Sequence, residues 1–339
     1  MAYSTGSATD QSDLMSKLST FAQANGFVQD NYDGTNKFLS LSRAADSLYV
    51  TFHWDGTNHI QIWQALGYNG TYAQQPWSQA NDSGNPGSSI ADPSQGRNIN
   101  RIGNGTFPTY HFFGYTNPYR IFVVLEYSAG LYRHFGFGKI NKAGSWTGGA
   151  FVAGHRWSDE GSSISIPGAV YHSLLLDGVY TPSTYAGVNK AGATIHMTGL
   201  PNQNSATKWG QFGGLNDSGT QHPGTDTASN PRDIAYGGFR NGLGVQQWGW
   251  MLPDLANGFL PIIPIELFYI YQETTTRSIW YYLGNLPDIG HIQLQGISAG
   301  QEITVGSDTW IAFPAVRKAN LGGANEESEN MGLIYKKVT

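Results

Sequence analysis

The sequence predicts a mainly β protein (α+β), in which an N-terminal arm and a helix precede antiparallel β-sheets and a small C-terminal β-barrel or sandwich. Three observations predict this class. Only 13% of the 339 residues are charged, about half the usual ~25%. The chain is also rich in residues of strands and turns, with 44 Gly, 10 Trp, 19 Tyr and 16 Phe. After one helical segment the hydrophobic pattern changes to a period of two residues.

The helix is predicted close to the N-terminus. Its apolar face, at helical spacing, consists of Leu14, Leu18, Phe21 and Ala22. Thr9 or Asp10 can cap its start, because a side-chain oxygen there accepts from a free backbone N–H. Asn25 and Gly26 form a typical C-terminal cap. We therefore expect a core-packing helix that follows a short arm.

Runs with a period of two predict the strands. They are residues 37–42, 48–54, 60–66, 110–115, 120–127, 131–140, 262–271, 278–283, 291–294, 302–305, 309–313 and 332–337. The short turn at residues 128–130 predicts a hairpin from the runs on either side of it.

The spacing of these runs divides the chain into three parts. Residues 1–143 form an N-terminal helix with an antiparallel β domain, 144–259 a loop-rich middle region, and 260–339 a C-terminal domain of short strands. A long loop rich in Ser, Asn, Gly and Pro is expected at residues 74–109. Loops of this length are usually functional or ordered by a partner.

The heptapeptide HWDGTNH, residues 53–59, is a candidate site. His53 and His59 bracket Asp55, and imidazole and carboxylate groups are common metal ligands. A metal needs a further ligand that converges on the same point, whereas Asp-Gly is also ordinary turn chemistry. Both interpretations stay open at this level, and the hairpin is the better supported.

A three-residue loop at residues 55–57 fixes the expected register of this hairpin. It pairs Phe52 with Ile60 and Val50 with Ile62, which places one apolar face toward the core. The opposite face would then carry Tyr49, His53, His59 and Trp63. Because that face is unusually aromatic for solvent, we predict that these four residues contact a neighbouring subunit.

Charge and composition limit the partners. The net charge is −5 and no basic stripe is present, so nucleic acid is not expected as a partner. Cysteine is absent, which excludes disulfides and thiolate metal sites. No signal peptide is visible at the N-terminus, and the apolar stretch at 260–271 is too short to span a bilayer. We expect no cofactor and no membrane insertion.

Enzymatic motifs are weak. Asp159 and Glu160 follow His155 and Trp157, and paired carboxylates beside a sugar perform glycoside hydrolysis. Adjacent residues of a strand point to opposite sides, however, so this pair is better explained as a solvated loop. The glycine-rich run at 238–244 lacks the lysine of a phosphate loop, and no GxSxG motif supports a serine hydrolase. No catalytic residue is predicted.

Three segments resemble structural proteins of tailed bacteriophages. The first is MAYSTGSATDQSDLMSKLSTFAQANGF, a Ser/Thr/Gly arm at residues 4–9 before a helix at 13–25 and a Gly-aromatic pair. The second is YRIFVVLEYSAGLYRHFGFGKI, residues 119–140, with its Gly-aromatic-Gly ending. The third is YYLGNLPDIGHIQLQGISAGQEITVGSDTWIAFPAVRK, residues 281–318, whose LGxLP element and WIAFP strand look like C-terminal parts of tail and baseplate proteins.

The resemblance implies a virion protein of the tail or baseplate that is assembled in the host cytoplasm and has no enzymatic activity. Its partners would be copies of itself and other tail proteins. Two alternatives remain. An adhesin at the tail tip would bind a host receptor or surface glycan, and a hydrolase of cell-surface polysaccharide would use Asp159 and Glu160.

Overall fold

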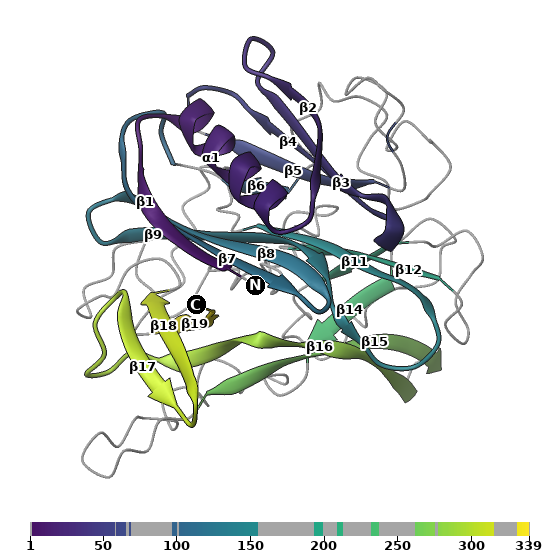
Figure 1. Cartoon of the computed structure of the whole chain (residues 1–339). Helices are drawn as coiled ribbons and strands as arrows, with labels where there is room; N and C mark the ends of the chain where they lie inside the picture. The colour runs from purple at the N-terminus through teal and green to yellow at the C-terminus, as the bar shows by residue number, and fades with distance from the viewer. Residues whose placement is uncertain are drawn as a thin grey trace, which may run out of the picture.

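The computed structural model describes residues 2–57, 59–65, 68, 97–99, 102–154, 193–198, 209–212, 232–236, 262–274, 277–314 and 331–338. Within them the protein is mainly β, with one α-helix and antiparallel sheets, as predicted. Figure 1 shows a small sheet and the helix above a central sheet, with the C-terminal strands below. One described strand pair, β13 with β14, is parallel.

The helix α1 (Gln11–Ala24) begins and ends where the sequence predicts. Asp10 is its N-cap, and the Asp10 carboxylate accepts from the backbone N–H of Asp13 at 2.8 Å. Asn25 is the C-cap, and Gly26 follows with φ 87°, a left-handed conformation that favours glycine. The buried face of the helix includes the four apolar residues expected from their spacing.

The N-terminal arm differs from expectation. Residues 2–8 form a strand, β1 (Ala2–Ala8), which pairs with β7 (Phe107–Thr116) of the same chain. Its Ser, Thr and Gly residues have no apolar alternation, so the sequence carries no signal for a strand here. Residues 2–8 become a strand because the apolar strand β7 has a free edge with which they pair.

A five-stranded sheet has the order β2-β3-β4-β5-β6. Its strands are β2 (Val28–Asp33), β3 (Phe38–Arg43), β4 (Leu48–Trp54), β5 (Ile60–Ala65) and β6 (Arg97–Ile99), with a short 3-10 helix at Ala44–Asp46. β6 and the start of β7 fall inside the predicted loop at 74–109. Most of the remaining loop lies outside the described residues.

The larger sheet has 14 strands in the order β1-β7-β8-β9-β11-β12-β13-β14-β15-β16-β19-β18-β17, with β10 paired to β16. Beyond β1 and β7, its first half contains β8 (Tyr119–Ser128), β9 (Leu131–Lys139), β10 (Asn141–Lys142), β11 (Thr147–Gly154), β12 (Ala193–Thr198), β13 (Trp209–Phe212) and β14 (Arg232–Tyr236). Its second half contains β15 (Ile263–Thr274), β16 (Arg277–Gln293), β17 (Gln301–Val305), β18 (Asp308–Pro314) and β19 (Met331–Lys337).

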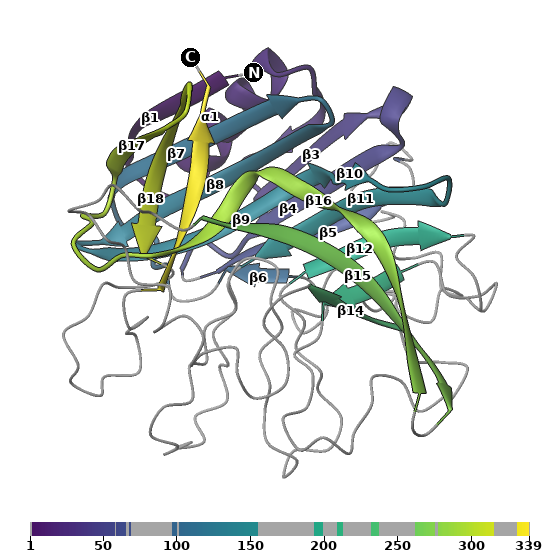
Figure 2. The ribbon, with the colours of Figure 1, turned by 90° about the horizontal axis from the view of Figure 1, so that it is seen from below.

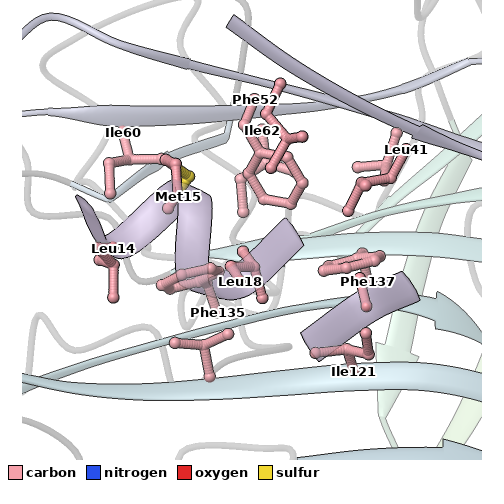
Figure 3. Close-up of a cluster of buried hydrophobic side chains, with 14 of the residues drawn as sticks. Leu14, Met15, Leu18, Leu41, Phe52, Ile60, Ile62, Ile121, Phe135 and Phe137 are labelled. Atoms are coloured by element: carbon pink, nitrogen blue, oxygen red, sulfur yellow. The ribbon is translucent and has the colours of Figure 1, made fainter. Parts of the chain in front are cut away.

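The central strands of this sheet are buried on both faces. In β8, Ile121, Val123 and Leu125 join one core, while Phe122 and Val124 join the other. This explains its uninterrupted apolar run, because a strand covered on both sides loses the polar half of its alternation. The first core lies between the central strands, α1 and the small sheet, as Figure 3 shows.

The second core lies between the central strands and the C-terminal strands, which curl underneath them (Figures 1 and 2). The C-terminal strands thus form one layer of a sandwich whose other layer is the central sheet. The chain termini meet at this layer, where the Lys337 ammonium lies 5.1 Å from the ring centre of Tyr3.

β16 spans both of the short strands predicted at 278–283 and 291–294. Its pairing with β15 shifts between Leu286 and Gly290, which bulges around the exposed Pro287. A bulge tolerates a proline that a regular ladder would not. The domain boundaries at 143 and 259 stay a prediction, although β9 pairs with β11 across the first and β14 with β15 across the second.

Candidate interface site

The HWDGTNH segment connects β4 to β5 in the small sheet and is a hairpin, as the alternation of its flanks predicts. Its apolar side faces the first core. Val50, Phe52, Ile60 and Ile62 are all buried there, each at 2% exposure or less. Trp54 joins them, and its indole N–H donates to the Ser12 hydroxyl at 2.9 Å. The strand pair is therefore anchored to the start of α1.

The polar groups of the turn stabilise the turn itself. The Asp55 carboxylate accepts from the backbone N–H groups of Thr57 and His59, at 2.7 and 2.9 Å, and from the His59 ring at 2.8 Å. Lys37 donates to the Asp55 carbonyl oxygen at 2.7 Å. The Gly56 N–H donates to the Gln11 side chain at 2.9 Å. Asp55 and His59 thus hold the loop closed.

The register differs from the one predicted. His53 lies opposite Gln61 rather than His59, and Tyr49 lies opposite Ala65 rather than Trp63. The predicted three-residue loop is wrong because the Asp55 carboxylate caps a longer loop that reaches His59. A shift of two residues keeps each side chain on its expected face, so the apolar face stays as predicted.

The opposite face of the hairpin is partly closed within the chain. Phe38, Ser40, Thr51 and Gln61 are buried on it, at 5% exposure or less. Tyr49 and His53 are half-buried, and the His53 ring stacks on Phe38 with 4.5 Å between ring centres. Burial lowers the pKa of His53 and is opposed by its hydrogen bond to Gln61.

Among the described side chains of β4 and β5 on this face, Tyr49 and His53 are the ones that a partner can reach. Trp63 lies opposite Thr51, and its side chain is outside the described residues. The contact role of Tyr49, His53, His59 and Trp63 stays a prediction.

The described residues offer few candidates for a metal site or a catalytic site. Within the described ranges, no group of three or more His, Asp or Glu side chains is arranged to hold a metal ion. His155, Trp157, Asp159 and Glu160 lie outside these ranges, as does the glycine-rich run at 238–244. No helix of the described chain has the length and hydrophobicity to cross a membrane.

Sequence reasoning missed a set of buried polar contacts in the second core. His134 is 1% exposed. Its Nε2 atom lies 2.7 Å from the Pro314 carbonyl oxygen, which can only accept, so Nε2 donates. Nδ1 of the neutral ring then accepts from the Tyr335 hydroxyl at 2.8 Å. This chain of hydrogen bonds joins β9 to β18 and β19.

Arg120 makes a second connection between the same layers. It is 1% exposed and forms an ion pair with Asp288 of β16. Burial lowers the pKa of Arg120 to about 10. The hydroxyl of Tyr115 donates to the Lys336 carbonyl oxygen at 2.7 Å. A signal was present in the sequence, because Arg120 and His134 are ionisable residues inside predicted strands that are otherwise rich in apolar side chains.

No family model matches the chain, and no curated protein matches it.

Proposed function

We propose that the protein is a structural component of a tailed-phage virion, in the tail or baseplate, that acts by self-assembly and by contacts with neighbouring tail proteins. One observation carries the proposal. The described residues of the three segments that resemble the phage family, 1–27, 119–140 and 281–318, pack together as one body. They supply β1 and α1, then β8 and β9, then most of β16 with β17 and β18.

Contacts between the segments are specific. His134 of the second segment hydrogen-bonds to Pro314 at the end of the WIAFP strand. Arg120 of the second pairs with Asp288 of the third. Phe27 of the first packs edge-on against Phe137 of the second, with 5.4 Å between ring centres. A pattern shared by three distant segments is easier to understand when they form one structural unit.

The Gly-aromatic-Gly ending of the second segment has a physical reason in this unit. A Cβ atom on Gly136 would lie 2.4 Å from the Phe122 ring, and one on Gly138 would lie 2.3 Å from the Arg120 backbone. Both glycines therefore make room for groups of β8, while Phe137 between them fills the first core. The motif is thus tied to the packing of this sheet on both of its faces.

The test combines location with assembly. Purified particles of the phage that encodes the chain should contain it at a fixed copy number by quantitative mass spectrometry. The recombinant chain should form defined oligomers by light scattering at rising concentration. A chain that is absent from the particles and stays monomeric at every concentration overturns the proposal.

A further inference from the structure

Counting the described strands, the 14-stranded sheet ends in two edge strands, β1 and β17, and the two edges are unequal. An edge strand presents unpaired backbone N–H and C=O groups, which natural proteins protect with charges, prolines, bulges or short length. β17 has five residues, and its Glu302 is paired with Lys337 at 2.7 Å. A second ion pair, Lys336 of β19 with Asp308 at the start of β18, lies nearby at 2.8 Å. The β17 edge is therefore short and charged.

The β1 edge lacks most of this protection. Its seven residues, AYSTGSA, include no charge and no proline. The exposed or half-buried part runs from Ala2 to Ser7, and β7 is its single neighbour among the described strands. Protection is confined to the C-terminal end, where the register shifts after Gly6 and Lys17 donates to the Ser7 carbonyl oxygen at 2.8 Å. An open, uncharged stretch from Ala2 to Gly6 remains.

We propose that this edge pairs with β1 of a second copy of the chain, antiparallel and about a two-fold axis at Ser4. The inference deepens the proposed function and rests on it for the presence of neighbouring copies. Pairing of identical strands requires that no like charges oppose each other, and β1 has none. The two-fold symmetry makes the contact self-complementary.

The side chains fit this register. Ala2 lies opposite the partner's Gly6 and Ser4 opposite the partner's Ser4, so one face carries only small groups. On the other face Tyr3 lies opposite the partner's Thr5, an aromatic and β-branched pair of the kind that stabilises cross-strand contacts. The Tyr3 ring is already fixed on its own chain by a 2.8 Å hydrogen bond to His111. The pairing would continue the sheet through the dimer.

Disulfide crosslinking of an introduced cysteine gives an unambiguous test, because the chain has no native cysteine. Neighbouring Cα atoms of antiparallel strands are about 4.5–5.5 Å apart, within the range that a disulfide spans. We expect Ser4→Cys in the full chain to form a covalent dimer under mild oxidation. The matched control is Thr304→Cys on the exposed β17 edge, which should stay uncrosslinked.

Substitutions of opposite charge at Ser4 distinguish a loss of β1 pairing from a loss of folding. The Ser4 side chain makes none of the hydrogen bonds found among the described residues, so Ser4→Glu and Ser4→Lys should both fold. Each should weaken self-association by about fivefold through like charges at the axis, and an equimolar mixture should restore it. Sedimentation velocity measures all three samples, with Thr304→Glu and Thr304→Lys as controls.

The outcomes distinguish the two proposals. If the chain oligomerises but Ser4→Cys gives no covalent dimer and the mixture gives no recovery, β1 pairing is wrong and assembly uses another surface. Crosslinking through Thr304→Cys in place of Ser4→Cys also overturns it. A chain that is monomeric throughout and absent from particles overturns the proposed function as well.

Discussion

The two faces of β9 are held to their neighbours in different ways. Toward the small sheet, Phe135 and Phe137 meet Phe52 edge-on, with ring centres 6.5 and 5.3 Å apart. Toward the C-terminal layer, His134, the residue before Phe135 in the strand, hydrogen-bonds to Tyr335 and Pro314. The hydrophobic effect of burying apolar surface is non-directional, whereas hydrogen bonds fix position. The first interface therefore depends on shape, and the second also depends on protonation.

The largest effect should come from the ring-packed face. Phe52 is fully buried, so Phe52→Ala removes its transfer free energy and leaves a cavity. We expect a loss of about 3–5 kcal/mol in the free energy of unfolding, measured by urea denaturation. Val305→Ala, at a position with 41% exposure, is the control and should change it by less than about 0.5 kcal/mol. A loss below about 1 kcal/mol for Phe52→Ala would mean that this core is not tightly packed.

The ring-packed face is also the part that the sequence predicts best. Burial on one side gives β4 and β5 a clear alternation, and the predicted boundaries of 48–54 match β4. The register of their hairpin was missed because one carboxylate, Asp55, decides the loop length. β1 and β2 were missed because neither has an apolar alternation, and their pairing depends on strands distant in sequence. In the C-terminal layer, the partners of His134 and Arg120 lie more than 150 residues away in the chain. A single sequence does not show which residues pair across such a separation.

Acid should act on the hydrogen-bonded face. Burial, with smaller contributions from nearby Arg133 and His111, lowers the pKa of His134 to about 4, and burial lowers the pKa of His291, a residue of β16 with 1% exposure, to about 3. The unfolded chain, with pKa near 6.5, binds these protons more readily. The stabilisation is therefore complete above pH 6.5 and is lost as the pH falls toward 4. From pH 7 to pH 5 we expect a loss of about 2 kcal/mol for each histidine.

The control for this prediction is His134→Gln, which keeps a donor and an acceptor without a titrating ring. Urea unfolding at pH 7 and pH 5 gives the difference between the two free energies for each protein. The variant should lose about 2 kcal/mol less than the parent between these pH values. Equal acid sensitivity in the two proteins would show that His134 is not kept neutral by its surroundings.

The smallest of the three effects on the free energy of unfolding should come from the removal of a single oxygen atom. Tyr335→Phe removes the hydroxyl that donates to Nδ1 of His134 and leaves the ring packing on Phe113 unchanged, at 4.8 Å between ring centres. We expect a loss of about 1–3 kcal/mol at pH 7, since a buried acceptor loses its donor. Tyr3→Phe, at the half-buried rim, is the matched control and should cost less. Measuring Tyr335→Phe again in a His134→Phe background sharpens the comparison. Both proteins of that pair lack the donor to the Pro314 carbonyl oxygen, so this cost cancels, and the loss from Tyr335→Phe should be smaller because its acceptor is already gone. If the loss is equal in the two backgrounds, the contact between the hydroxyl and His134 contributes no more than shape, and the two faces of β9 are held alike.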